Sequence, residues 1–501
     1  MGSAKKIASG VIWSLVVNLV NAIYGFISVP ILINHFGKSE YGIIGLAMSI
    51  NIYMQLMDMG FNSTNVRFFS SWLAKKDYAK TNKLFQTSLS FYGIIGLFNA
   101  LILIGISFFS SEIFNLTTEQ DGILKTLFYI LAASAFISWF SSCFDQLIRA
   151  TENVAWIQRR TIIPKILQII ILFITVYGEL SISIYFFLTT FALFSIIPMS
   201  VSKIKKETPF IKFVPNIDKA TLKEILPYCV NIFSFSIFQF SFYNLRPVFL
   251  GIQGTMESIA DYRILNGIIG VVSMFGSVFL GALLPSASKA VSQNNMNAYY
   301  KVAYDGTKYI SIILSFCAFG MMTVGNEVII MYVGKSYLYL IPWFNLWLLC
   351  TLGVHNQAIS SLILAGTNIR ALTYNTCLAS ILGLIASWVL IPYYQIGGVI
   401  IAFIIYLIVQ YIFYYFYYWP KKMKINSKQV FIRSFIPYVM IGSIIYFIIN
   451  RFLDFTFKQV FVSFLIKGIV FTILFFSICL ITTNKMERDK LYSLIRFRNK
   501  H

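Results

Sequence analysis

Apolar residues occur in long blocks along the chain, and short polar segments separate the blocks. Most blocks have about 20 residues, which is the length that an α-helix needs to cross a hydrocarbon core of roughly 30 Å. The strict alternation that is typical of transmembrane β-strands is absent. The pattern therefore predicts fourteen transmembrane helices, near residues 9–33, 41–61, 85–110, 123–146, 161–179, 181–201, 225–251, 259–285, 309–331, 341–364, 372–392, 397–419, 435–450 and 459–482.

The segment around Gly178 decides the orientation of everything that follows it. Only the four residues GELS, 178–181, separate two apolar runs. We interpret the runs as two spans. The alternative is one long helix, which would invert the orientation of every later span.

The basic residues support fourteen spans with both termini in the cytoplasm. Of the 40 Lys and Arg residues, 31 fall in segments that this topology places inside and five in segments that it places outside. Cytoplasmic loops of membrane proteins carry such an excess. The net charge of +21 then reflects orientation and contact with anionic membrane lipids, so nucleic-acid binding is not expected.

Composition agrees with this class of protein. Hydrophobic residues make up 58% of the 501 positions and charged residues 12%, with a mean hydropathy of +0.74, which excludes a soluble globular domain of this length. The first apolar block follows Lys5 and Lys6 and has no small-residue cleavage site, so we expect a signal anchor that also forms the first span.

Motifs for catalysis, metal binding or ATP hydrolysis are not found in the sequence. The six cysteines are isolated and the three histidines are scattered, so neither predicts a metal site. A GxxxxGK[ST] phosphate loop and a GxSxG elbow are both missing. We therefore expect no cofactor and no enzymatic activity.

Two segments suggest an internal repeat. SVPILINHFG (28–37) closes the first span and LRPVFLGIQG (245–254) closes the seventh, and both have Pro at the third position and Gly at the tenth. The fold class that follows is an all-α polytopic membrane protein with two pseudo-symmetric six-helix bundles. The predicted divisions are an N-terminal half, a cytoplasmic linker, a C-terminal half, and two extra helices with a basic cytoplasmic tail, at 1–202, 203–224, 225–420 and 421–501.

Three stretches carry a resemblance to a known family. GVIWSLVVNLVNAIYGFISVPILINHFGKSEYGIIGLA (10–47), FLGALLPSASKA (279–290) and SWVLIPYYQIGGVIIAFII (387–405) resemble polysaccharide flippases of the multidrug/oligosaccharidyl-lipid/polysaccharide exporter superfamily, in order along nearly the whole chain. The resemblance implies a flippase of the cytoplasmic membrane that moves undecaprenyl-pyrophosphate-linked oligosaccharide to the outer leaflet by alternating access. It also implies a lipid-linked oligosaccharide and a polysaccharide polymerase as partners, and coupling to Na+ or H+ that the sequence does not identify.

Two arginines in the hairpin between the seventh and eighth spans are the first candidate site. Arg246 and Arg263 lie near the outer leaflet, in a chain that keeps most basic residues in cytoplasmic loops. A pyrophosphate headgroup inside the membrane requires cationic side chains, because bare phosphate charge is very costly there. Asp261, in the same hairpin, is also a candidate for substrate binding. The alternatives are that both arginines extend to the outer interface, or that Arg246 pairs with Asp261. The resemblance implies a headgroup role for Arg263, since the lipid II flippase has an arginine in an approximately matching pattern.

Further polar residues within spans are candidates for contact with the sugar. They lie in the first, seventh and tenth spans and comprise Asn18, Asn21, Gln239, Tyr243, Asn244, His355 and Gln357. Hydrogen bonding between helices explains each of them equally well, and His355 is either a satisfied packing residue or a group that titrates with a coupling proton.

Other functions remain open at this stage. A cation-coupled multidrug exporter of the same fold would favour acidic cavity residues, in contrast to the two arginines. A lipid II flippase is a further alternative, although the first span has Asn18 and Asn21 where that protein would have an Arg-Asp pair. A membrane scaffold or a lipid-modifying enzyme is the third class, and the enzyme lacks an exposed catalytic cluster.

Overall fold

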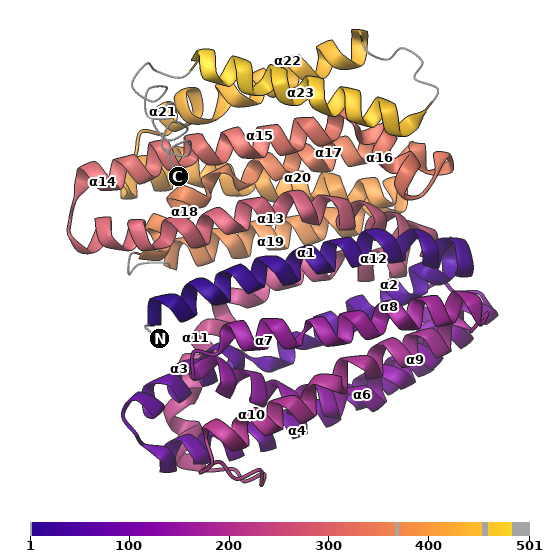
Figure 1. Ribbon diagram of the computed structural model, residues 1–501, viewed down its shortest axis with the longest axis vertical. Helices are drawn as coiled ribbons and strands as arrows, with labels where there is room; N and C mark the ends of the chain where they lie inside the picture. Colours follow the sequence, from indigo (N-terminus) through magenta and orange to yellow (C-terminus); the bar gives the residue numbers. More distant parts are fainter. Residues whose placement is uncertain (1–2, 366–369, 453–458, 483–501) are drawn as a thin grey trace, which may run out of the picture. The chain divides into compact units, whose positions relative to one another are not determined.

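The computed structural model describes residues 3–365, 370–452 and 459–482. All regular structure in these residues is helical, as predicted, and the chain is a multi-pass membrane protein (Figure 1). The helices form two compact units. Unit 1 contains Met1–Ile264 and Ser380–Val399, and unit 2 contains Leu265–Ala379 and Ile400–His501. The basic tail at 483–501, and with it the predicted cytoplasmic C-terminus, lies outside the described residues.

Unit 1 holds the first twelve α-helices and parts of three others. Its elements are α1 (Ser3–Phe36), α2 (Lys38–Tyr53), η1 (Met54–Asp58), α3 (Phe61–Ala74), α4 (Tyr78–Phe108), α5 (Ser110–Ile113), α6 (Thr118–Ala150), α7 (Val154–Arg160), α8 (Ile162–Tyr177), α9 (Ile182–Ala192), η2 (Leu193–Ile196), α10 (Ile197–Glu207), α11 (Lys219–Asn244) and α12 (Arg246–Gln253), with the start of α13 (Met256–Ser292), the end of α19 (Arg370–Tyr394) and the start of α20 (Ile396–Phe413).

Unit 2 holds the rest of those three helices and the C-terminal elements. These are α14 (Met296–Lys301), η3 (Val302–Gly306), α15 (Thr307–Thr323), α16 (Gly325–Tyr332), η4 (Lys335–Leu340), α17 (Ile341–Thr351), η5 (Leu352–Asn356), α18 (Gln357–Ala365), η6 (Tyr414–Lys422), α21 (Ser427–Gln429), η7 (Val430–Phe435), α22 (Ile436–Phe452) and α23 (Val460–Thr482). The predicted divisions at 1–202, 203–224, 225–420 and 421–501 concern a repeat. They stay predictions, because the two compact units are defined by which residues pack together and not by similarity between the two halves of the chain.

Each of the fourteen predicted spans coincides with helix, but fewer elements qualify as membrane spans. Among the described residues, eleven helices are long and apolar enough to cross a membrane, or thirteen if each of two bent pairs counts as one span. The number fourteen and the position of the termini stay predictions. One bent pair joins Lys38–Asp58 to Phe61–Ala74 at 46°, where Met59 and Gly60 have positive φ angles of 48° and 79°.

The GELS segment separates two helices, as predicted. Helix α8 ends at Tyr177, and the chain turns through Glu179, whose φ is 49°. The amide of Gly178 donates to the Ile174 carbonyl at 2.8 Å, and α9 begins at Ile182 and packs against α8. A single long helix at this point is therefore excluded.

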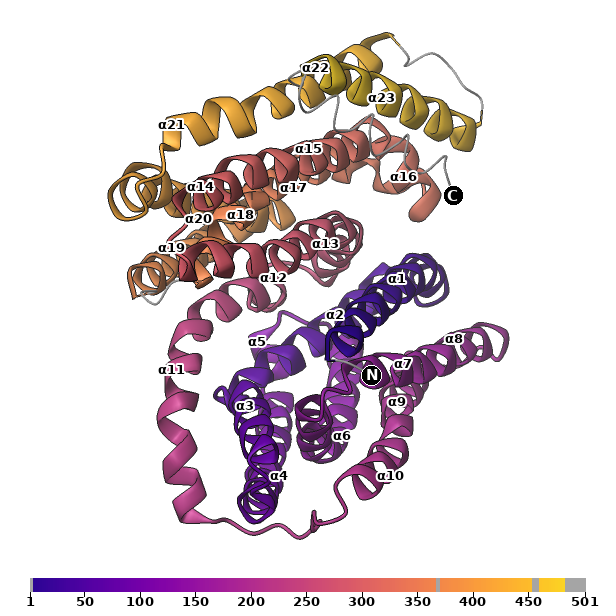
Figure 2. The same cartoon turned by 60° about the vertical axis from the view of Figure 1, so that its left-hand side comes forward.

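The predicted linker packs along the end of α4 in unit 1. From α10 it passes as an extended segment to α11 (Figure 2). The Lys212 amide donates to Asn82 Oδ1 at 2.7 Å, and the Asp218 amide donates to Thr87 Oγ1 at 3.1 Å. Asp218 also caps α11, and the hydrogen bonds that its carboxylate accepts from Thr221 hold its pKa below the usual value. These bonds set where α11 begins.

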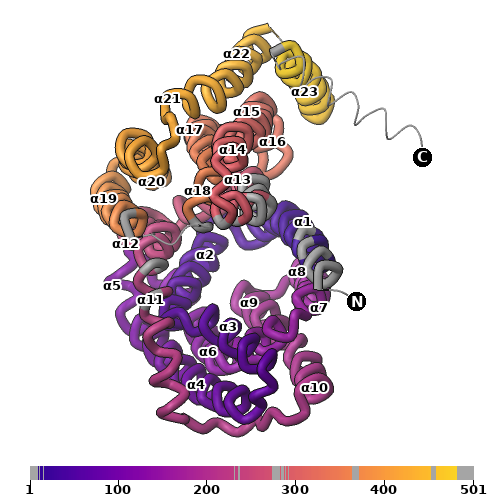
Figure 3. The backbone as a smooth tube through the Cα atoms, turned by 90° about the vertical axis from the view of Figure 1, so that its left-hand side faces the viewer, coloured from indigo at the N-terminus to yellow at the C-terminus, as the bar shows by residue number. Residues whose placement is uncertain are grey.

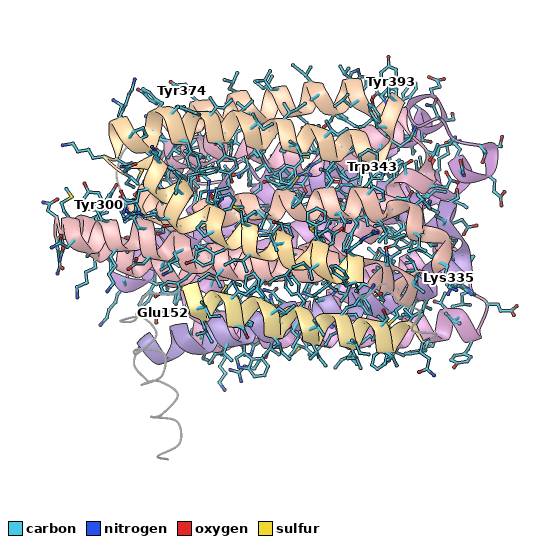
Figure 4. The ribbon with its side chains drawn as sticks, turned by 90° about the horizontal axis from the view of Figure 1, so that it is seen from above. Glu152, Tyr300, Lys335, Trp343, Tyr374 and Tyr393 are labelled. Carbon is cyan, nitrogen blue, oxygen red and sulfur yellow. The ribbon has the colours of Figure 1, made fainter. Side chains whose placement is uncertain are left out.

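The two C-terminal helices of unit 2 pack beside α15 (Figure 3). Phe316 of α15 contacts Phe471 and Phe475 of α23, with ring centroids 6.1 and 5.6 Å apart. Tyr300 and Lys335 lie at opposite ends of the unit 2 helices (Figure 4), on segments for which the charge pattern predicts opposite sides of the membrane.

Candidate functional site

Unit 1 contains two adjoining cavities, which we call the polar chamber. Their volumes are about 270 and 400 Å³, and they share Ser138 and Ser142 of α6. The chamber is lined mainly from η1, α3, α6, α9 and α11. Its polar lining comprises Asn51, Gln55, Asp58, Asn62, Ser63, Ser134, Ser138, Ser141, Ser142, Asp145, Arg160, Gln168, Thr189, Thr190 and Ser200.

The smaller cavity is built around Arg160, the last residue of α7. Its side chain is buried, at 2% exposed, and forms an ion pair with Asp145 of α6 and a hydrogen bond to Ser200 of α10. The Trp156 ring lies 5.2 Å from the guanidinium carbon. Arg160 Nε has no hydrogen-bond partner among the residues that the structure describes. An unsatisfied buried donor is costly, so this nitrogen adds to the free energy needed to hold Arg160 inside the unit.

The larger cavity borders a chain of hydrogen bonds that joins four elements. Asp58 of η1 accepts from the Tyr92 hydroxyl at 2.6 Å, and Tyr92 accepts from Gln146 Nε2 at 2.6 Å. Asn65 of α3 donates to Gln146 Oε1 at 2.8 Å. Three of these residues lie behind the cavity wall, so they hold the Asp58 carboxylate at the cavity.

The chamber can bind a hydroxyl-rich ligand. Serine and threonine hydroxyls and the amides of Asn and Gln both donate and accept hydrogen bonds. A sugar needs both kinds of partner, because burial of its hydroxyl groups is costly unless each is paired. The chamber differs in this from the apolar surfaces of the helices that enclose it.

Two predicted site residues of α13, Asp261 and Arg263, each contact α2 at one end of unit 1. Asp261 of α13 forms an ion pair with Lys38 of α2, with Nζ and Oδ1 2.8 Å apart. Arg263 lies over the Tyr41 ring, 4.4 Å from its centroid. A Cβ carbon at Gly45 would lie 2.9 Å from Ile259 Cγ2, so α2 and α13 pack very closely here. The structure therefore gives Asp261 and Arg263 contacts within the protein, and their predicted contact with substrate stays untested.

Arg246 begins α12 and is buried. Its Nε donates to the Phe242 carbonyl at 3.2 Å, and its guanidinium carbon lies 4.8 and 4.9 Å from the ring centroids of Phe242 and Tyr243. Arg246 is only 2% exposed. The sequence-based alternative in which its side chain extends to the membrane interface is therefore wrong.

The remaining predicted residues lie apart from the chamber lining. On α1 the side chains of Asn18 and Asn21 are exposed, as are Gln239 and Tyr243 on α11. Asn244 Nδ2 donates to the Phe240 carbonyl at 2.8 Å within its own helix. A role for these residues in binding stays a prediction.

His355 lies in unit 2 and is buried. Its Nδ1 lies 2.9 Å from the Leu352 carbonyl, its Nε2 lies 2.7 Å from the Tyr415 hydroxyl, and the ring stacks on Phe435 with centroids 4.1 Å apart. Both ring nitrogens thus have partners, as the packing alternative expects. Gln357 is partly exposed at the start of α18.

The sequence analysis did not predict the chamber. Arg160 was there only one of the 31 basic residues assigned to predicted cytoplasmic segments. Ser134, Ser138 and Ser141 follow one another at intervals of four and three residues along α6, and Ser142 lies four residues after Ser138, which places these serines on one helical face. This spacing was the signal that could have identified the polar face.

Comparisons with solved structures show the fold. The lipid II flippase MurJ in an inward closed conformation aligns with a TM-score of 0.69 at 17% identity, over 96% of this chain and 100% of that chain. A multidrug resistance MATE family transporter in an inward-facing conformation aligns with a TM-score of 0.58 at 14% identity, over 86% and 96%. The MATE multidrug transporter DinF-BH aligns with a TM-score of 0.52 at 14% identity, over 83% and 96%.

Comparisons at the level of sequence identify the family to which the chain belongs. None of the curated protein sequences compared with this chain matches it. A family model described as polysaccharide biosynthesis protein matches residues 7–291. Since this match covers more than half of the chain, the protein belongs to the polysaccharide biosynthesis protein family, with the fold of MurJ and MATE transporters.

Proposed function

We propose that this protein is a flippase that moves undecaprenyl-pyrophosphate-linked oligosaccharide from the inner to the outer leaflet of the cytoplasmic membrane, for synthesis of a cell-surface polysaccharide. The observation that carries the proposal is the polar chamber inside a membrane-embedded unit, lined by hydroxyl and amide groups with one buried arginine. Family membership and the transporter fold support the same function.

The chamber serves the sugar in this proposal. Sugar hydroxyls lose hydrogen bonds to water when they leave the cytoplasm, and the serine and threonine hydroxyls of the chamber replace those bonds. Alternating access carries the headgroup across, with Na+ or H+ as the coupling ion, and a polysaccharide polymerase uses the product.

Arg246 and Arg263 serve the pyrophosphate in this proposal. Arg263 rests on Tyr41 in the present conformation, and it reaches the phosphates once α2 and α13 separate. A guanidinium binds phosphate through two parallel hydrogen bonds, so lysine should replace either arginine only in part. Alanine at either position should abolish transport at unchanged abundance in the membrane.

The test uses cells that lack their own copy of the protein. Wild-type protein should restore the surface polysaccharide and clear undecaprenyl-pyrophosphate oligosaccharide from the inner leaflet. Ser138→Phe places a large ring in both cavities and should abolish restoration. Thr126→Phe is the matched control, because Thr126 is an exposed hydroxyl residue on the same helix outside the chamber. Both variants are compared at equal abundance in the membrane.

Three results would contradict the proposal. Full polysaccharide from the Ser138→Phe variant would remove the chamber from the transport path. Unchanged polysaccharide in the deletion strain, together with greater sensitivity to cationic dyes, would indicate the drug exporter. Accumulation of lipid II alone would indicate the lipid II flippase.

A further inference from the structure

Unit 2 has an apolar groove on its surface, with a volume of about 810 Å³. Its walls come from α17 and η5, from α20 and η6, and from the segment α21–η7. We call it the α20 groove. Ile408, Ile412 and Phe416 of its lining are each more than half exposed. In a membrane protein such a surface faces lipid, so the groove is open to hydrocarbon chains.

The polar groups in the floor of the groove already have hydrogen-bond partners within the protein. His355 lines it, and both of its ring nitrogens already have partners in Leu352 and Tyr415. Tyr411, also in the lining, donates its hydroxyl hydrogen to the Gly353 carbonyl. The polar atoms of the floor are thereby satisfied inside the protein, and an apolar chain can lie over them without leaving a buried group unpaired.

One end of the groove has a different chemistry. Ser427 and Lys428 of α21 line it there, and Ser427 Oγ is buried with no hydrogen-bond partner among the described residues. The segment 414–435 carries Lys421, Lys422, Lys424, Lys428 and Arg433 and no acidic residue. Helix α21 lies at the same end of the unit 2 helices as α14 (Figure 1). This end therefore offers positive charge to an anion.

The length of the groove favours a phospholipid acyl chain over an undecaprenyl chain. Along α20 and η6 its lining runs from Ile404 to Phe416, which at 1.5 Å per residue spans about 18 Å. One leaflet of a bilayer has a hydrocarbon depth of about 15 Å, half of the roughly 30 Å core. One acyl chain of a phospholipid fits this length, whereas an undecaprenyl chain is far longer than one leaflet.

From these observations we infer that the α20 groove binds one anionic glycerophospholipid. An acyl chain lies along α20, and the phosphate contacts Lys428. The lipid belongs to the leaflet at which segment 420–433 lies, which is the cytoplasmic leaflet by the distribution of basic residues. Bound there, the lipid fills the space between α20 and the η7–α22 segment. This inference does not depend on the transported substrate.

The test measures lipid bound to the purified full chain by native mass spectrometry, with phosphatidylglycerol and phosphatidylcholine as probes. The wild type should retain one phosphatidylglycerol at detergent concentrations that remove phosphatidylcholine. Lys428→Glu should lower this retention about tenfold, and Lys422→Glu, in the same basic segment outside the groove, should not. Ile408→Trp should also abolish it by filling the groove. Ile444→Trp is the control, because Ile444 is equally exposed on α22 and does not line the groove.

Two outcomes would overturn the inference. Equal retention of the two lipids, or equal loss in the groove variants and their controls, would show that lipid binds to the general surface. Displacement of phosphatidylglycerol by an equimolar amount of undecaprenyl phosphate would assign the groove to a polyprenyl chain instead. A loss of helical signal in Ile408→Trp is checked by circular dichroism, and the Lys428→Glu comparison decides the question in that case.

Discussion

Gly42 of α2 packs directly against the backbone of Met256 at the start of α13. A Cβ carbon on Gly42 would lie 2.7 Å from the Met256 carbonyl carbon, which is closer than real side chains approach. Glycine is therefore required at this position for α2 and α13 to lie together. The contact holds this end of unit 1 closed in the present conformation.

Gly42→Ala should shift the protein away from this closed arrangement. Overpacking costs about 1–3 kcal/mol, which shifts a two-state equilibrium by roughly one to two orders of magnitude. Spin labels at positions 40 and 255, in a background without native cysteines, should report a longer distance in this variant. Gly105→Ala is the control, because a Cβ carbon there meets open space. Identical distance distributions in the two variants would show that α2 and α13 do not separate.

Variants of the Lys38–Asp261 ion pair distinguish between two possible roles of Asp261, which are closure of α2 onto α13 and binding of substrate. If the carboxylate closes α2 onto α13, Lys38→Ala and Asp261→Ala should reduce transport alike. The exchanged variant Lys38→Asp with Asp261→Lys should then recover much of the activity, because the pair is restored in reverse. If Asp261 binds substrate, as the sequence suggested, the exchange will not restore transport. Surface polysaccharide per molecule of protein in the membrane is the measurement.

A buried ion pair joins α23 to α16 in unit 2. Lys467 Nζ lies 2.8 Å from Glu327 Oε1, which also accepts a hydrogen bond from Ser463, and both charged side chains are buried. Glu327→Gln or Lys467→Met alone should cost about 3–5 kcal/mol of unfolding free energy, because one charge stays buried without its partner. The double variant Glu327→Gln with Lys467→Met should cost much less than the sum of the two single variants, because it leaves no buried charge without a partner. Denaturant unfolding in mixed micelles measures this, and a double variant as unstable as the sum of both singles would contradict it.

The predicted orientation has a direct test. Thr117, at the start of α6, should face outside, and Asn216, between α10 and α11, should face the cytoplasm. Single cysteines at these positions, with the six native cysteines replaced, are labelled in whole cells with an impermeant reagent. We expect labelling at 117 only. Labelling at 216 without labelling at 117 would invert the topology.

The sequence was sufficient to predict an all-helical membrane fold, although α4 begins seven residues before the predicted span 85–110 and α6 extends beyond both ends of 123–146. Long apolar blocks predict spanning helices, because unpaired backbone groups are too costly inside a membrane. The turn after Tyr177 followed from the GELS segment together with the distribution of basic residues. The grouping of Arg246 with Arg263 as a pyrophosphate site came from the sequence and stays a prediction.

The polar chamber and the buried ion pairs could not be predicted in the same way. Asp145 pairs with Arg160 rather than with nearby Arg149, and Lys467 pairs with Glu327 from a distant part of the chain. In a membrane the faces toward lipid and toward other helices are both apolar, so hydropathy does not report how each helix is rotated. Rotation decides which polar residues share a cavity, and it is set by the packing of all the helices together.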